Sequence, residues 1–557
     1  MPETHEVLNQ VPPLVDYDVF AADRPLTEAL ERHGAGWAAG ELRALGRLAG
    51  SARAQEWGSD ANAFPPRLLT HDRYGHRIDE VAFHPAYHEL MTVAVRAGLA
   101  GGPWRDPRPG AHAARAAGMI VWCQVDAGHI CPISMTYAAV PALRAAPELA
   151  AVWEPALTSP EYDPGLRPIG TKTGALAGMA MTEKQGGSDV RANRTRAVPR
   201  PDGTYAITGH KWFCSAPMND VFLVLAQAPD GLTCFAVPRV LPDGTRNTFR
   251  LQRLKDKLGN RSNASSEVEF ADTLGWRCGP EGRGVATIVE MVAATRLDCV
   301  LGSAALMRAG LAAALHHSAH RHAFGRPVID APAARNVLAD LALESEAATA
   351  LALRLAATFD ATGSGDASGP AAERERERER GLRRLGTAVA KYYVCKRAPV
   401  HAAEALECLG GNGYVEESGL PRIYREAPLN SVWEGTGSIN ALDAERAMLR
   451  EPGALEAFLA EVELAGGADR RLDTAAAALR TELGRADEFG ARRLVEMMAL
   501  VLAGSLLVRH APSEVADAFC ASRLDSGGGR AFGARTFGTL PDGLKVDPIL
   551  TRYQPIT

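Results

Sequence analysis

The sequence predicts a mainly α-helical protein that also contains one small antiparallel β domain and an additional helical domain near the C-terminus. Three observations predict this fold class. Ala/Leu-rich segments with helical periodicity fill residues 24–177, short β-branched and aromatic runs fill residues 204–272, and about forty residues without proline follow Gly284. At 557 residues, the chain is long enough for three or four structural units.

Residues 1–177 form the first expected domain. Helical pieces such as "LTEALERHGAGWAAGELRALGRLA" alternate there with Pro and Gly breaks, so we expect it to be helical throughout. Residues 178–283 are expected to form the β domain, because short β-branched or aromatic runs occur there, several of them separated by Pro-Asp-Gly turns: "TYAITGHKWF", "DVFLVLAQA", "LTCFAVPRV", "TFRLQRL" and "SEVEF".

Residues 284–450 are expected to form a helical bundle that starts with one long helix or a helix pair. Within it, "GSGDASG" (residues 363–369) predicts a flexible connector, and "ERERERER" (residues 373–380) predicts a solvated helix start or an exposed linker without chemistry. Residues 451–540 form an Ala-rich helical domain, and residues 541–557 an extended tail.

The composition excludes several classes of protein. It is 46% hydrophobic and 23% charged with a net charge of −5, so no strongly basic balance indicates nucleic acid. The nine cysteines are odd in number and lack a C-x-x-C pair, which argues against a disulfide framework or a zinc site and favours a reducing cytoplasm. No signal peptide and no apolar run of ~20 residues are recognisable, so no membrane partner is expected.

The stretch "GMAMTEKQGGSDVRANRTRA" joins the helical segment to the β domain. It places Thr182, Gly186, Gly187, Ser188 and Asp189 within a few residues of one another. Two glycines let a ligand approach the backbone, and hydroxyl and N–H groups bind phosphates or the edge of a heteroaromatic ring. An interdomain turn with an Asx cap explains the same residues equally well.

The strand "GHKWFCS" places Trp212 beside this Gly-rich loop. An aromatic side chain on a strand is usually part of the core, but Trp212 could also stack on a cofactor ring.

The long helix ends in "RHAFGRP". Arg321 there either caps the last carbonyl groups of the helix or reaches a diphosphate. The histidines upstream do not predict a metal site, since no carboxylate or cysteine lies close in sequence. They are His316, His317, His320 and His322.

Two further glycine-rich segments need separate interpretations. Gly410-Gly411-Asn412-Gly413 is either a site of close backbone approach or a helix C-cap. "GTGSIN" lacks the third glycine of the dinucleotide fingerprint and does not clearly follow a strand, so a Rossmann enzyme is not expected.

Glu434 lies between Trp433 and Gly-Thr-Gly in "REAPLNSVWEGTGSINALDAERAM". A carboxylate in this setting is either a cap at a helix start or a base held in a partly desolvated pocket.

Taken in order, these motifs resemble the acyl-CoA dehydrogenase family over residues 24–450. The motifs "MTEKQGGSDV", "GHKWFCS", "RLKDKLGNRSNAS" and "YREAPLNSVWEGTGS", with the additional C-terminal region, are similar to its AidB-type branch of adaptive-response flavoproteins, which is linked to DNA alkylation damage. The resemblance implies a helical domain, an antiparallel β domain and a helical bundle, followed by the extra domain.

The resemblance further implies FAD as cofactor, an acyl-CoA or related small molecule as substrate, and Glu434 as the catalytic base. Arg321 and Phe324 would serve the FAD of a neighbouring subunit, which implies a homotetramer. Trp212, Phe213 and Cys214 replace the usual Trp-Ile-Thr, with loss of a hydroxyl donor. The implied cofactor contacts are Met181, Thr182, Ser188, Trp212, Phe213, Cys214, Arg321, Phe324, Gly410, Gly411, Thr436 and Ser438.

Two readings of function follow from this resemblance. One is a dehydrogenase of the AidB type with specialised activity and possible binding of double-stranded DNA; the other is a metabolic or biosynthetic dehydrogenase without DNA binding. Residues 451–557 carry 12 Lys/Arg against 15 Asp/Glu, a net of −3, which does not favour DNA. The best local candidate, "RRLGTAVAKYYVCKR", is more easily explained as a solvated or intersubunit face.

Overall fold

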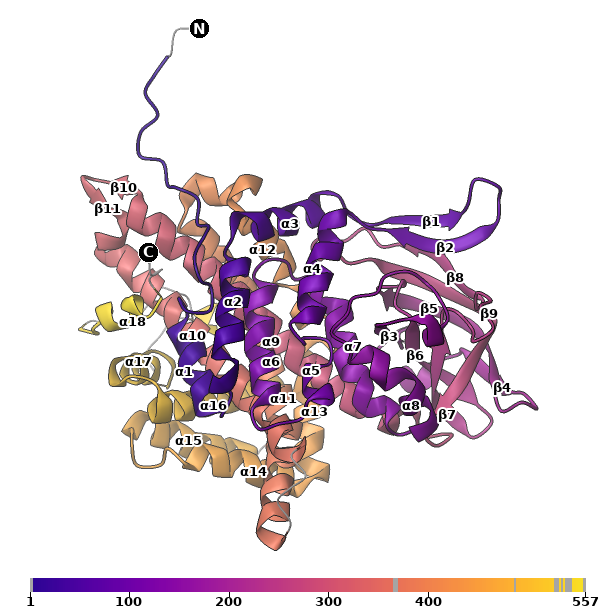
Figure 1. The fold of residues 1–557 in the computed structure, drawn as a ribbon. Helices are drawn as coiled ribbons and strands as arrows, with labels where there is room; N and C mark the ends of the chain where they lie inside the picture. Colours follow the sequence, from indigo (N-terminus) through magenta and orange to yellow (C-terminus); the bar gives the residue numbers. More distant parts are fainter. Residues whose placement is uncertain are drawn as a thin grey trace. The chain divides into compact units, whose positions relative to one another are not determined.

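The computed structural model describes residues 4–363, 369–484, 487–524, 530–531, 534–535 and 543–553. They belong to two compact units. Unit 1 comprises residues 1–55, 112–124 and 299–557, and unit 2 comprises residues 56–111 and 125–298. Figure 1 follows the chain through both of them.

Unit 2 contains a seven-stranded sheet in the order β3-β6-β4-β5-β9-β7, with β8 paired to β9. Strand β6 also pairs with β7, so five of the strands form a closed ring. The strands and helices of this unit are β1 (Arg67–His71), β2 (Arg77–Ala82), β3 (Ala177–Ala180), β4 (Arg196–Pro199), β5 (Tyr205–Ser215), β6 (Val221–Ala228), β7 (Gly231–Pro238), β8 (Phe249–Leu254), β9 (Ser265–Cys278), α4 (Pro85–Arg96), α5 (Gly102–Arg105), α7 (Ile130–Leu143) and α8 (Pro147–Leu157).

The predicted strand runs are confirmed as β5 to β9. Side chains that alternate along these strands meet in one core, which includes Ile207, Phe222, Phe235, Phe249 and Val268, all with at most 1% of their surface exposed. Burial on this scale, at about 25 cal/mol per Å² of apolar surface, is the main stabilising contribution to such a domain.

The expectation that the N-terminal segment is helical throughout is wrong at one place. Strands β1 and β2 form an antiparallel hairpin there. Val81 packs into the core of the sheet, the Arg77 guanidinium donates to the Leu251 carbonyl (2.9 Å), and the Leu251 N–H donates to Asp79 (3.2 Å). The hairpin therefore belongs with the β domain of unit 2, although it lies within the helical part of the sequence.

Unit 1 is built almost entirely of helices. Its long helices α10 and α11 pack against each other, and α11 also packs against α13, α14 and α16. Helices α3 and α9 cross the boundary between the units. The elements are α1 (Arg24–Arg32), α2 (Ala39–Ala49), α3 (Ala52–Ala63), α6 (Ala111–Cys123), α9 (Gly284–His320), β10 (His322–Ala323), β11 (Arg326–Pro327), α10 (Pro332–Gly363), α11 (Pro370–Glu407), α12 (Leu420–Glu426), α13 (Gly437–Arg450), α14 (Pro452–Glu463), α15 (Arg470–Leu483), α16 (Ala491–His510), α17 (Ser513–Phe519), β12 (Arg530–Ala531), β13 (Ala534–Arg535) and α18 (Asp547–Thr551).

The segment "ERERERER" is a helix start, the first of its two predicted readings, but it is not wholly solvated. Glu379 is 4% exposed and forms a bidentate ion pair with Arg354 of α10, at 2.7 and 2.8 Å. Arg354 also binds Glu461 of α14 (2.8 Å). The connector predicted before it falls mainly on residues 364–368, outside the described residues.

Buried ion pairs join helix α10 to the C-terminal region. Arg523 pairs with Asp340 and with Glu344 (3.1 Å), and Arg397 of α11 also pairs with Glu344 (3.2 Å). Burial opposes ionisation of Glu344, but the two arginines outweigh this effect and lower the pKa of its carboxyl to about 2.

The prediction of an extended tail is wrong for its described part, which contains the short helix α18. Pro548 suits the first turn of a helix, and Ile549 and Leu550 are buried. Beyond the helix, Arg552 pairs with Glu346 (2.8 Å) and Glu28 (2.7 Å), so the tail is held by α10 and α1.

Within the described ranges, every helix is too short or too polar to cross a lipid bilayer.

Candidate active site

The turn that carries Glu434 connects a short 3-10 helix, η7 (Leu429–Ser431), to helix α13. Glu434 is half-buried and has a φ of 57°, and Gly435 after it has a φ of 96°. A left-handed backbone at a non-glycine residue costs of order 1–3 kcal/mol, and such strain persists only where the surroundings enforce it.

Two buried side chains enforce this conformation. Lys391 of α11 is 1% exposed, and its Nζ donates to the carbonyl oxygens of Trp433 (2.7 Å) and Gly435 (2.5 Å). Asn440 of α13 is also buried and donates from Nδ2 to the same Gly435 carbonyl (2.6 Å). The carbonyl groups of the residues before and after Glu434 are therefore held by side chains.

The indole of Trp433 is oriented in the same way. Its Nε1 donates to Oδ1 of Asn430 (3.0 Å), and Nδ2 of Asn430 donates to Ser303 Oγ (3.2 Å) on helix α9. The aromatic neighbour of Glu434 is thus tied to helix α9 through the buried amide of Asn430.

Thr436 is the N-cap of helix α13, and its hydroxyl accepts the Ile439 N–H at 3.5 Å. Of the two sequence readings of Glu434, the helix cap is therefore wrong. Ser438, two residues further, is exposed. Cofactor contacts by Thr436 and Ser438 stay a prediction.

In unit 2, the loop that follows β3 holds Met181, Thr182 and Ser188. Met181 and Thr182 are half-buried, whereas Ser188 is exposed. The Trp212 N–H donates to the Thr182 carbonyl (2.8 Å), so the loop is bonded directly to strand β5. A Cβ at Gly187 would lie 2.4 Å from the Thr182 hydroxyl, so this glycine is needed for the loop to close.

A buried ion pair fixes the loop. The Glu183 carboxylate accepts from Lys211 Nζ (2.9 Å), from the backbone N–H groups of Arg194 (2.7 Å) and Thr195 (3.1 Å), and from the Gln185 amide (2.7 Å). Burial opposes its ionisation, yet these donors lower the pKa of Glu183 to about 2. Burial also lowers the pKa of Lys211 to about 8, against the attraction of Glu183.

Positive charge surrounds the Trp212 ring. Lys255 Nζ lies 3.2 Å from the ring centroid, Lys184 Nζ lies 5.7 Å away, and the Arg253 guanidinium carbon lies 5.6 Å away. Glu267 is paired with both Arg253 and Lys255, at 2.6 Å each. Three cations around one half-buried indole suit a ligand that combines a flat ring with negative charge.

The two residues after Trp212 differ in environment. Phe213 has 52% of its surface exposed, whereas Cys214 is completely buried in the core of the sheet. Burial raises the pKa of the Cys214 thiol to about 12, so the thiol is neutral at physiological pH. Any ligand contact of Cys214 would come from its backbone.

Arg321 and Phe324 lie at a small hairpin formed by β10 and β11. The Arg321 guanidinium donates to the Asn9 carbonyl, and the Asn9 side chain bonds His322 in both directions at 2.8 Å. Phe324, at the tip, has a φ of 52° and is fully exposed in this chain.

Gly410 and Gly411 begin a 3-10 turn, η5 (Gly410–Tyr414). Gly410 has a φ of 59°, which favours glycine, but a Cβ at either position would meet no atom within 4 Å. Among the described residues, the space that a Cβ at either glycine would take is therefore open.

The histidines near the end of α9 bond to the backbone and to each other. His316 donates from Nε2 to the Pro12 carbonyl (2.8 Å), and its ring lies 4.3 Å from that of His320. In the described part of the chain, no group of three or more His, Cys, Asp or Glu side chains is placed to hold a metal ion.

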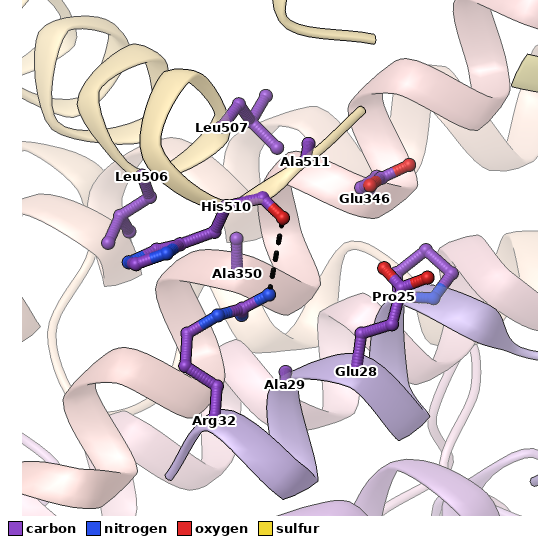
Figure 2. A pocket seen from close by; sticks show the side chains of 10 residues that line it. All are labelled: Pro25, Glu28, Ala29, Arg32, Glu346, Ala350, Leu506, Leu507, His510 and Ala511. Atoms are coloured by element: carbon purple, nitrogen blue, oxygen red, sulfur yellow. Dashed lines mark hydrogen bonds between the residues drawn. The ribbon is translucent and has the colours of Figure 1, made fainter. Parts of the chain in front are cut away.

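Unit 1 also contains a small pocket of about 20 Å³ between helices α1, α10 and α16, lined in part by Glu28, Arg32, Glu346 and His510. Figure 2 shows the bond from Arg32 to the carbonyl of His510 that crosses it (3.4 Å). A cavity of this size holds about one water molecule, which excludes a flavin or a thioester.

The structure brings the predicted site residues together in small groups, each within one unit. Glu434, Thr436 and Ser438 share a turn in unit 1, and Arg321 and Phe324 share a hairpin there. Met181, Thr182 and Trp212 share a bonded loop and strand in unit 2.

The side chains that hold these groups were not predicted as site residues from the sequence. They are Lys391 and Asn440 in unit 1, and Glu183 and Lys211 in unit 2. A lysine inside the apolar run "GTAVAKYYVC" was the available signal. The prediction that the segment "RRLGTAVAKYYVCKR" presents a solvated or intersubunit face is wrong for Lys391 and Arg397, which are 1% and 3% exposed.

Residues 9–164 match the model of the adaptive response protein AidB N-terminal domain. Residues 178–273 match the middle domain of acyl-CoA dehydrogenases, and residues 282–449 match their C-terminal domain.

One relative covers almost the whole chain. The Escherichia coli K12 protein named "Putative acyl-CoA dehydrogenase AidB" is 45% identical over 529 residues, which is 95% of this chain and 96% of that protein. Among solved structures, Caenorhabditis elegans ACDH-11 in complex with C11-CoA is 26% identical with a TM-score of 0.83, over 94% of both chains. A Bacillus anthracis acyl-CoA dehydrogenase complexed with FAD (18% identity, TM-score 0.61, covering 79% of this chain and 80% of that one) shows the same fold.

The three matched domains follow one another along the chain as a mainly helical segment, a β domain and a helical segment, as the structure has them. Similarity to AidB extends through the C-terminal region. The chain therefore belongs to the acyl-CoA dehydrogenase family of oxidoreductases, in its AidB-type branch.

Proposed function

We propose that the protein is an FAD-dependent acyl-CoA dehydrogenase whose catalytic base is Glu434. The observation that carries this proposal is the Glu434 turn, a half-buried carboxylate on a left-handed backbone that is braced by Lys391 and Asn440. Strain that is maintained at this cost is typical of functional sites.

The donor set of unit 2 fits FAD. Thr182 and the adjacent Gly186-Gly187 backbone offer hydroxyl and N–H donors, and Trp212 offers an aromatic face surrounded by cations. These groups suit a cofactor with a heteroaromatic ring and a pyrophosphate. Bound FAD would take up the hydride that leaves the β-carbon of the substrate.

The protein's own contribution is proton transfer. The Glu434 carboxylate removes the α-proton of an acyl thioester, and the neighbouring Trp433 limits its access to water. A positioned general base of this kind typically contributes ~10²–10⁴-fold to the rate.

An anaerobic titration with acyl-CoA thioesters tests the proposal. Short, branched and long thioesters, including the C11-CoA bound by the nematode relative, would be added to the flavoprotein while its visible absorbance is followed. Rapid bleaching by one of them supports the proposal and identifies the substrate class. Bleaching by none, with FAD bound and reducible by dithionite, contradicts it.

Replacing Glu434 with Gln tests the residue. The variant should keep FAD, and the rate at which a thioester bleaches its flavin should fall by ~10²–10⁴-fold. A control variant at the exposed Glu417, Glu417→Gln, should behave like the wild type. Wild-type bleaching by Glu434→Gln would remove the assignment of the base.

We also propose a homotetramer in which Arg321 and Phe324 reach the FAD of a neighbouring subunit. The full exposure of Phe324 at a hairpin tip supports a covering partner. A cytoplasmic location is supported by the cysteines, all nine of which are free thiols. The domain boundaries at residues 177, 283, 450 and 540 stay our proposal for the chain.

A role in the response to DNA alkylation is the second candidate, and the similarity to AidB supports it. Direct DNA binding has weaker support, because Lys391 and Arg397 are buried and Arg384 is paired with Asp443 (3.1 Å) and Glu451 (3.1 Å). A gel-shift titration with double-stranded DNA at rising salt separates this candidate from a purely metabolic dehydrogenase, since binding through phosphates weakens steeply with salt.

A further inference from the structure

Lys391 has an unusual pair of partners. Its ammonium group is 1% exposed, and its described bonds go to two carbonyl oxygens, those of Trp433 and Gly435. These carbonyls belong to the residues immediately before and after Glu434. A single buried cation therefore binds the backbone on both sides of Glu434, the residue to which we assign the proton transfer.

The bonding has a direct effect on the backbone of Glu434. For both flanking carbonyls to point at one Nζ, the chain between them must curl, and Glu434 has a φ of 57° in this curl. Asn440 adds a second donor to the Gly435 carbonyl at 2.6 Å, but it lies on the helix that follows the turn. Lys391 lies on α11, so it alone of the two ties the turn to a helix distant in sequence.

Packing alone does not require a lysine here. Its neighbours on α11 along the chain, Ala390 and Tyr392, are also buried, and a buried ammonium is costly unless its donors are satisfied. Two of the donors of Lys391 are satisfied by the carbonyl oxygens of Trp433 and Gly435, the residues on either side of Glu434. The cation and the turn therefore stabilise each other.

We propose that Lys391 is a positioning residue for the reaction, which holds the backbone of Glu434 so that its carboxylate meets the α-proton of the thioester. This inference rests on the proposed role of Glu434 as the base. Lys391 itself acts through the peptide groups and need not touch the substrate. Its removal should change the rate of proton transfer far more than the affinity for the thioester.

The test uses the FAD-loaded protein and the variant Lys391→Met, which keeps the length of the side chain and removes its donors. The matched control is Lys172→Met. Lys172 is a buried lysine of unit 2 that pairs with Asp220 (2.7 Å) and has no described bond to the turn. Both variants lose a buried ammonium, so both should melt earlier.

Two readouts separate positioning from stability. The first is exchange of the α-protons of the bleaching thioester with deuterated water, together with kcat and KM. A displacement of about 1 Å in a reacting group costs about 10²-fold, so Lys391→Met should lose about 10²-fold in exchange and kcat with KM changed less than about 3-fold. Lys172→Met should keep wild-type exchange. The second readout is a crystal structure of Lys391→Met. In it, the φ of Glu434 should lie outside the left-handed region.

The inference is overturned if Glu434 keeps its left-handed φ in Lys391→Met, or if α-proton exchange stays within about 3-fold of the wild type. If Lys391→Met does not fold, Lys391→Gln, which retains one shorter donor, is judged by the same criteria. If the wild-type protein exchanges the α-protons of no thioester, and no thioester bleaches its flavin, the proposed function fails. The φ of Glu434 in the variant then decides the structural part of the inference by itself.

Discussion

The loop that holds Met181 and Thr182 depends on one carboxylate, so the variant Glu183→Gln should weaken unit 2 strongly. All four described partners of this carboxylate are donors: Lys211 Nζ, the N–H groups of Arg194 and Thr195, and the amide of Gln185. A glutamine offers only one acceptor oxygen and turns an NH₂ group toward donors. It would leave the buried ammonium of Lys211 without its counter-charge.

The size of the loss can be estimated in two ways. Breaking a buried ion pair by removing one partner costs ~3–5 kcal/mol. Independently, the pKa of Glu183 is lowered from 4.5 to about 2, which corresponds to ~3 kcal/mol at 1.36 kcal/mol per unit. The side chain is fully buried, so solvent screening does not reduce this figure much. For a unit of about 230 residues, ~3–4 kcal/mol lowers the melting temperature by ~6–16 °C.

The loss of stability should depend on pH in a defined direction. The contribution of Glu183 is fully present above pH 4.5 and is lost as the pH falls through about 2, because the lowered pKa favours the ionised folded state. At high pH, Lys211, whose pKa is lowered to about 8, sheds its proton and no longer needs the carboxylate. The variant should therefore differ most from the wild type between about pH 4.5 and 8.

Thermal melting followed by circular dichroism measures the loss, and hydrogen exchange with mass spectrometry localises it to residues 181–195 and 205–215. The matched control is Glu269→Gln, at an exposed glutamate of strand β9. If Glu183→Gln melts within about 1 °C of this control at pH 7, with unchanged exchange in the loop, the ion pair does not hold the loop and the reasoning is wrong.

Three further predictions concern other parts of the fold. Arg523→Met removes the cation from two buried carboxylates and should cost ~3–5 kcal/mol, seen as earlier melting and faster hydrogen exchange in α10. Gly128→Ala would place a Cβ 2.0 Å from Ser262 Oγ and should cost ~1–3 kcal/mol, while Gly102→Ala, which meets nothing within 4 Å, should be nearly neutral in the same melting assay. Phe324→Ser should lower the mass measured by sedimentation equilibrium, and an unchanged mass would exclude its hairpin from the subunit interface.

Local patterns predicted the strands well. The runs that became β5 to β9 are rich in β-branched or aromatic residues, and Pro-Asp-Gly lies between β6 and β7 and between β7 and β8, so composition and turn chemistry both indicated their structure. Strand β3, "AGMA", lacks this signal because its small residues have low β-propensity, and it pairs only through its neighbour β6. The β1–β2 hairpin was missed although Gly75 marks its turn with a φ of 89°, because helical pieces surround it on both sides.

The site was predicted in part. Trp433-Glu434-Gly435 was recognised from its local sequence, but Lys391 contacts it from 42 residues away. No pattern in a single sequence links these positions, and the same lysine was read as part of an exposed basic face. Buried charge is generally the hardest feature to predict, since a charged residue is expected at the surface unless its partner is known.

The ion pairs of helix α10 bear on any attempt to shorten this protein to the length of an ordinary dehydrogenase. Asp340, Glu344 and Glu346 lie at most 3% exposed, and their arginine partners Arg523 and Arg552 lie beyond residue 450. A truncation there would remove these two cations from carboxylates that are buried inside the bundle. The C-terminal region is thus an integral part of the bundle's interior and not a detachable module. Questions about its role are better asked with single substitutions than with deletions.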